Sequence, residues 1–84
     1  MIDPIIVGNV IQNCRQEKGV SQEVLSGFAG IGRTHLSAIE RGERKPTLET
    51  FCHIAVALGM KSSELLSVIE SKIYESAENF SDTK

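Results

Sequence analysis

Apolar residues recur at three- and four-residue steps through most of this 84-residue chain, which is the period of one face of an α-helix. No segment alternates apolar and polar residues for long enough to predict a strand. Glycines and a proline interrupt the helical pattern, and capping residues precede most of the new runs. The pattern predicts five helices, which run from Pro4 up to Gly19, from Gln22 to Ala29, from Arg33 to about Arg41, from a cap at Thr47 up to Gly59, and onward from Ser62 or Ser63. The expected fold class is all-α.

Each predicted helix carries apolar residues, and in the first, third and fourth helices they are expected to share one face. They are Ile6, Val7, Val10, Ile11 and Cys14 in the first helix, Val24, Leu25 and Phe28 in the second, Leu36 and Ile39 in the third, and Leu48, Phe51, Cys52, Ala55 and Leu58 in the fourth. Phe28 either packs under the C-terminal segment or stays exposed, and the sequence does not choose between these. In the last helix Leu66, Ile69 and Ile73 keep a helical spacing, so this face packs either on the core of its own chain or on a second copy, and a dimer contact is the preferred interpretation.

Composition predicts one small folded domain. Apolar residues make up 40% of the chain and charged residues 24%, unlike a disordered chain. We place the domain at residues 1–78 and a flexible tail at residues 79–84. No apolar run approaches the roughly 18 residues of a membrane span, and the start Met1-Ile2-Asp3-Pro4 lacks the basic residues of a secretion signal, so a cytoplasmic protein is expected.

The cysteines and histidines do not predict a cofactor or a metal site. Cys14 and Cys52 are far apart and belong to no CxxC pair, which is typical of free thiols in a reducing compartment. Together with His35 and His53 they lack the tight ligand spacing of a zinc site. Neither histidine accompanies a recognisable nucleophile, and no phosphate-binding glycine loop is present, so an enzyme is not expected.

The net charge of −2 is unevenly distributed along the chain. Residues 15–61 hold seven Lys or Arg against five acidic residues, whereas residues 62–84 hold two Lys against five acidic residues. An anionic ligand is therefore expected to meet the middle segment.

The second and third predicted helices have the spacing of a helix-turn-helix. Two helices that cross steeply need a small residue where their backbones approach, a residue that tolerates positive φ at the corner, and apolar anchors under the second helix. Counted from Gln22, the chain supplies Leu25, Ser26, Gly30, Leu36 and Ile39 at the fourth, fifth, ninth, fifteenth and eighteenth positions. All five fit these requirements.

The strings KGVSQE (18–23) and GIGRTHLSAIERGERKPTL (30–48) resemble the Cro/C1-type repressor domain, also called the XRE family, over roughly Ile6 to Leu66. The resemblance implies a five-helix, lambda-repressor-like domain, here with an extended C-terminal helix. It also implies a binding module without catalysis that binds double-stranded operator DNA, usually as a homodimer, with the third helix in the major groove. Neither a membrane nor a small-molecule ligand is expected as a partner.

The resemblance, together with the inward positions of Leu36 and Ile39, assigns candidate roles to the third helix and its surroundings. The expected base-reading residues are Arg33, Thr34, Ser37 and Ala38, and Arg33 can donate two hydrogen bonds to guanine O6 and N7. The expected phosphate contacts are Gln22, His35, Arg41, Arg44 and Lys45, although partial burial is an equal alternative for His35. Arg15 and Glu40 match positions that pair inside the fold of many relatives.

Three residues depart from the family pattern, and one other function stays open. Gly32 stands where a Ser or Thr cap is common, Phe28 stands at an often polar position, and Glu43 adds a negative charge to the loop expected to contact DNA. The alternative function is a protein-interaction module on the same fold, such as an antitoxin or an adaptor. The cluster of basic residues around the third helix favours DNA.

Overall fold

The computed structural model describes the backbone of residues 2–82 and the side chains of residues 2–76. Within that range it contains five helices and no strand, which confirms the predicted all-α class. The helices are α1 (Pro4–Lys18), α2 (Gln22–Ala29), α3 (Arg33–Glu40), α4 (Leu48–Ala57) and α5 (Ser62–Asp82).

The predicted helix starts are confirmed by their capping hydrogen bonds. Asp3 Oδ1 accepts from the Ile5 amide at 2.9 Å, and Pro4 occupies the first turn, where no amide hydrogen is needed. Ser21 Oγ accepts from the Val24 amide at 3.1 Å, and Thr47 Oγ1 accepts from the Thr50 amide at 3.1 Å. These local bonds fix where α1, α2 and α4 begin, because they satisfy amides that no helical carbonyl can reach.

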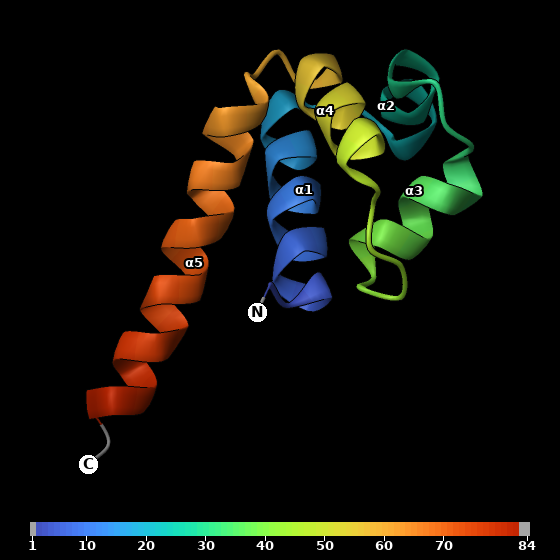
Figure 1. Cartoon of the computed structure of the whole chain (residues 1–84). Helices are drawn as coiled ribbons and strands as arrows, with labels where there is room; N and C mark the ends of the chain where they lie inside the picture. The colour runs from blue at the N-terminus through green and yellow to red at the C-terminus, as the bar shows by residue number, and fades with distance from the viewer. Residues whose placement is uncertain (1, 83–84) are drawn as a thin grey trace.

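Helix α1 stands at the centre of the molecule and packs against α3 on one side and α5 on the other, while α2 packs against α3 and α4 (Figure 1). The core lies where these helices meet. Its largest fully buried side chains are Ile11, Leu25, Leu36, Ile39, Ile54, Leu58, Leu65 and Ile69. Because every helix contributes to this list, the five elements form one cooperative unit.

Some apolar residues predicted to face inward are exposed. Leu48 is 79% exposed because it begins α4, one turn before the helix meets the core. Further along the same helix, Ile54 is fully buried, although the sequence did not predict it as a core residue. In α2 only Leu25 of the three apolar residues is buried, together with Ala29. Phe28 is 78% exposed, so of its two alternatives the structure shows exposure.

The predicted dimer residues do not share one environment. Ile69 is fully buried in the core of its own chain, so its interpretation as a dimer contact was wrong. Ile73 is half-buried against that core, and its part in a dimer stays a prediction. The helical spacing that suggested a contact with a second copy serves packing on α1 and α4 instead. Only Leu66 of the three is exposed.

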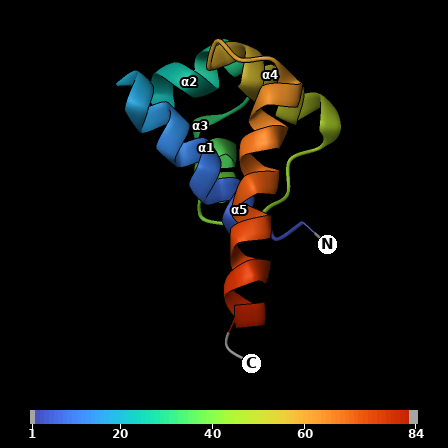
Figure 2. The same cartoon turned by 90° about the vertical axis from the view of Figure 1, so that its left-hand side faces the viewer.

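Helix α5 continues past the end of α1 and extends away from the other four helices (Figure 2). The helix ends at Asp82, four residues beyond the domain boundary that the sequence placed at residue 78. The predicted flexible tail at residues 79–84 lies outside the described side chains, and its flexibility stays a prediction.

Among the described residues, no single helix is both long and apolar enough to cross a membrane, and α4 with the first part of α5 meets that test only as a pair bent by 102°. Cys14 and Cys52 are free thiols. Burial, with a smaller contribution from the charge of Glu17, raises the pKa of the Cys14 thiol, which keeps it protonated.

Candidate nucleic-acid interface

Helices α2 and α3 form the helix-turn-helix that the sequence spacing predicted. Leu25, Leu36 and Ile39 are buried in the core, and Ser26 is buried where a larger side chain would keep the two helices apart. The corner residue Gly30 has a φ of 71°, in the left-handed region that glycine adopts without strain. The inner face of α3 is therefore fixed to the body of the domain.

The outer face of α3 is open to solvent. Arg33 and Thr34 are exposed, and Ser37, one turn further along, is half-buried. Figure 1 places α3 on the side of α1 opposite α5, so the long C-terminal helix does not cover it. His35 is half-buried at the margin of this face, which leaves both alternatives for it standing.

The first turn of α3 has no side-chain cap. Gly32 occupies the cap position with φ −72° and provides no oxygen for the free amides. The missing Ser or Thr cap therefore leaves the start of α3 without a side-chain hydrogen bond. Its position depends on the backbone and on the packing of Leu36 and Ile39.

Ala38 is not presented to solvent as predicted, because it is only 9% exposed. It lies at the far edge of the outer face, and its carbonyl accepts a hydrogen bond of 2.9 Å from the Glu43 amide as the chain turns back after α3. The interpretation of Ala38 as a base-reading residue exposed on α3 was therefore wrong.

A buried ion pair links α1 to α3. Arg15 Nε donates to Glu40 Oε2 at 2.7 Å and Nη2 donates to Glu40 Oε1 at 3.1 Å, while Nη1 donates to the Val20 carbonyl at 2.9 Å. The two side chains are only 11% and 1% exposed. This is the pair that the family resemblance implied, and it fixes the angle at which α3 leaves the core.

Gln22 belongs to the same network. Its Nε2 donates to Glu40 Oε1 at 2.9 Å, so one of the two amide hydrogens expected to meet a phosphate is already used inside the protein. The bond places the start of α2 beside the end of α3. Sequence reasoning missed it because Gln22 and Glu40 belong to different helices, and no spacing rule relates them.

A second ion pair lies on the surface where α3 ends. Arg41 Nε donates to Glu43 Oε2 at 2.9 Å and Nη2 donates to Glu43 Oε1 at 3.0 Å, and Nη1 also donates to Ser37 Oγ. Hydrogen bonding with Arg41, and then the charge of its guanidinium, lowers the pKa of Glu43, while the same contacts raise that of Arg41. The carboxylate is therefore ionised and paired near neutral pH.

The loop after α3 carries two further basic side chains. Arg44 and Lys45 are exposed and have no recorded ion pair with any residue whose side chain the structure describes. Gly42 holds the loop against α1. Its φ is 77°, and a Cβ there would lie 2.8 Å from Ile5 Cγ1 and 2.9 Å from Ile5 Cα. A side chain at position 42 would thus push the loop away from α1.

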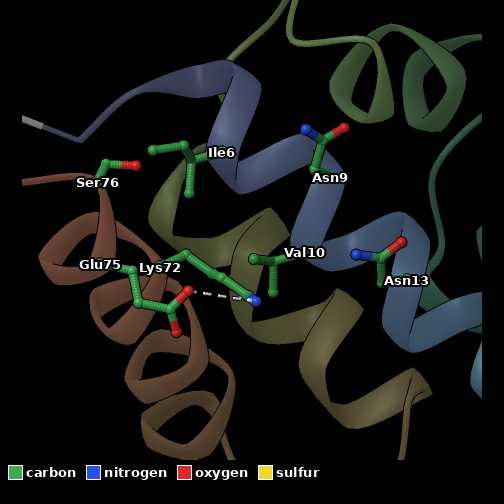
Figure 3. A pocket seen from close by; sticks show the side chains of 7 residues that line it. All are labelled: Ile6, Asn9, Val10, Asn13, Lys72, Glu75 and Ser76. Carbon is green, nitrogen blue, oxygen red and sulfur yellow. Dashed lines mark ion pairs between the residues drawn. The ribbon is translucent and has the colours of Figure 1, made fainter. Parts of the chain in front are cut away.

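Two hollows lie away from the outer face of α3. Figure 3 shows the first, between α1 and α5, where Lys72 Nζ lies 3.7 Å from Glu75 Oε1 and the other polar lining residues, Asn9, Asn13 and Ser76, are neutral. Its two charges offset each other, so it offers no unpaired charge to a ligand. The second is an apolar groove lined by Ile2, Pro4, Val7, Lys45, Pro46, Leu48, Phe51, Leu66 and Ile69.

Comparisons with known proteins agree with this geometry. A family model described as Helix-turn-helix matches residues 11–65. The chain is 39% identical to the HTH-type transcriptional regulator y4dJ of Sinorhizobium fredii over 74% of this chain and 80% of that one. It is 34% identical to the control protein C.SmaI of Serratia marcescens over 74% of each.

Among solved structures, the restriction-modification controller protein C.AhdI of Aeromonas hydrophila superposes with a TM-score of 0.73 at 32% identity, over 77% of this chain and 98% of that one. The C.Esp1396I tetramer in complex with its natural 35 base-pair operator superposes with a TM-score of 0.80 at 28% identity, over 88% and 97%. The chain therefore belongs to the XRE family of helix-turn-helix transcriptional regulators.

Proposed function

We propose that this protein is a sequence-specific regulator of transcription that binds double-stranded DNA as a homodimer on a roughly palindromic operator. It is a repressor of the phage, plasmid or restriction-modification controller type, and it works in the cytoplasm as a binding protein rather than an enzyme. The observation that carries the proposal is the exposed outer face of α3, whose inner face is anchored in the core.

The start of α3 supplies the base contacts. Arg33 presents an exposed guanidinium at the first position of the helix and donates two hydrogen bonds to guanine O6 and N7 in the major groove, a contact worth about 1–3 kcal/mol of discrimination. Thr34 contacts a base edge or a thymine methyl group beside it. Ser37 is short enough to let the helix approach the bases closely.

The phosphate contacts come from the residues around α3. Arg44 and Lys45 are exposed on the loop and neutralise phosphates on one side of the groove. Gln22 donates its remaining amide hydrogen at the start of α2, where free backbone amides also favour an anion. His35 donates from the margin of α3. These contacts set the register of the protein on the duplex without reading its sequence.

A second copy of the chain is the partner that completes the site. The apolar groove combines the exposed side chains Ile2, Leu48 and Leu66 with half-buried Pro46 and Phe51, and burying these side chains against a second copy removes them from water. Lys45, which also lines the groove, stays outside the buried area in this arrangement, so that its charge can meet a phosphate. That C.Esp1396I binds its operator as a tetramer supports an oligomer. Two copies present two α3 helices to successive major grooves about 34 Å apart.

Selection of bound duplexes from a random pool tests the proposal. We expect enrichment of two inverted half-sites whose centres lie about 10 base pairs apart. Affinity for the enriched duplex is expected to fall by orders of magnitude between about 50 and 200 mM salt, as counterions return to the DNA. If no sequence is enriched and the weak binding ignores salt, the protein-interaction module becomes the better assignment.

A further inference from the structure

The guanidinium of Arg41 is held by two neighbours on the surface of the proposed interface. Glu43 receives two parallel hydrogen bonds from it, at 2.9 and 3.0 Å, and Ser37 Oγ receives a third. Both charged side chains are more than half exposed, at 53% and 60%, so the network is open to a ligand rather than buried in the core. It lies on the same helix face as Arg33.

This arrangement is unfavourable for a phosphate contact by Arg41. A phosphate that took the guanidinium would leave the Glu43 carboxylate unpaired next to a polyanion, and like charges at that distance repel. Glu43 is only two residues away in a tight turn and offers the bidentate geometry that a guanidinium prefers. The local carboxylate therefore keeps Arg41, and phosphate binding is left to Arg44 and Lys45.

The third hydrogen bond determines what Ser37 can offer to a base. A hydroxyl has one hydrogen to donate and two lone pairs to accept with. Arg41 occupies one lone pair with a charged donor, which polarises the hydroxyl and directs its hydrogen away from the guanidinium. Ser37 is thereby biased toward donating, and the major-groove acceptors are purine N7, guanine O6 and thymine O4.

We propose that Arg41 and Glu43 are positioning residues that set Ser37 as a hydrogen-bond donor, and so determine the base preference at one operator position, without Arg41 contacting a phosphate. This inference rests on the proposed function. It assigns Glu43, which in sequence only adds a negative charge to a basic loop, a specific part in recognition.

The test compares Arg41→Gln, Ser37→Ala and Glu43→Ala with the control Arg44→Gln. Each variant is measured against the enriched duplex and its single-base variants between about 50 and 200 mM salt. Arg41→Gln is expected to keep the wild-type salt slope and to reduce discrimination roughly 2- to 10-fold at the operator position that Ser37→Ala also affects. Glu43→Ala relaxes the same position, and the Ser37→Ala, Arg41→Gln double variant loses no more than Ser37→Ala alone.

Arg44→Gln, by contrast, is expected to lower the salt slope by about 0.9 and to keep every base preference, because it removes one phosphate contact. If Arg41→Gln lowers the slope in the same way and leaves the preference at the Ser37 position intact, Arg41 is a phosphate contact and this inference is overturned, while the proposed function stands. A wild-type chain that enriches no duplex overturns both.

Discussion

Arg15 is the residue that most directly couples the fold to the position of α3. Its guanidinium uses three nitrogens, two on Glu40 and one on the Val20 carbonyl, so one side chain joins α1, the turn before α2, and the end of α3. A buried pair of this kind adds little stability compared with apolar residues of the same volume. Removing one partner is costly, because the other charge stays buried without compensation.

Arg15→Ala is therefore expected to destabilise the domain by about 3–5 kcal/mol, a large part of the total stability of a chain of this size. The matched control is Arg33→Ala, which removes an exposed arginine and should change stability by no more than about 0.5 kcal/mol. Urea unfolding measures both. Equal losses in the two variants would contradict the structural role of Arg15.

For single residues, the sequence predicted roles that depend on the position within one helix and missed roles that depend on a partner far away in the chain. The Arg15 to Glu40 pair came from the family resemblance, and Arg33 and Thr34 are exposed as the inward positions of Leu36 and Ile39 required. Ala38 was misplaced, since the sequence put it on the exposed face of α3 whereas it is only 9% exposed in the fold. The bond from Gln22 to Glu40 depends on how two helices cross, which no single-helix pattern contains.

The crossing of α1 over α3 depends on the absence of a side chain at Gly8. A Cβ at that position would lie 2.6 Å from the Glu40 carbonyl oxygen and would also overlap the carbonyl oxygen of Ile39. Both are backbone atoms of the last turn of α3, so neither can move without separating the two helices. The close approach brings Glu40 within reach of Arg15.

Gly8→Ala is accordingly expected to destabilise the domain, although alanine favours an isolated helix by about 1 kcal/mol over glycine. Overlap with fixed backbone commonly costs about 1–3 kcal/mol or more, and we expect it to outweigh the helix preference. The control is Gly27→Ala in α2, where nothing lies within 4 Å of a new Cβ and a gain of about 0.5–1 kcal/mol is expected. Urea midpoints that rise in both variants would contradict the crossing geometry.

Element boundaries were the most predictable part of the fold. Asp3, Ser21 and Thr47 cap their helices through bonds within three residues, so short sequence windows contain the whole cause. The inward faces were less predictable at helix ends. Leu48 fits the apolar period of α4, but the helix begins outside the core, and only the packing of α4 against its neighbours decides where burial starts.

On the scale of the whole molecule, the apolar groove is the surface on which we propose that two copies meet. Leu48 lines it and is 79% exposed in the single chain, so a charge there costs the monomer little. Glutamate at the first position of α4 even favours that helix, because the N-terminal end of a helix attracts negative charge. Association, in contrast, requires this position to be buried.

Leu48→Glu is expected to produce a folded monomer with weakened operator affinity. Val56→Glu is the matched control, since Val56 is 71% exposed on the same helix and does not line the groove. Sedimentation equilibrium gives the mass of each, and circular dichroism reports its helix content. A Leu48→Glu protein that sediments as a dimer, like the control, would place the contact between copies elsewhere.

We propose that the outer face of α3 reads base edges in the major groove, with Arg33 on a guanine. It is tested most directly by replacing the guanines of the enriched operator, one at a time, with 7-deazaguanine, which lacks the N7 acceptor. We expect a roughly tenfold loss of wild-type affinity at one guanine in each half-site, and no loss there for Arg33→Ala. Equal losses in the two proteins, or no loss at any guanine, would contradict it.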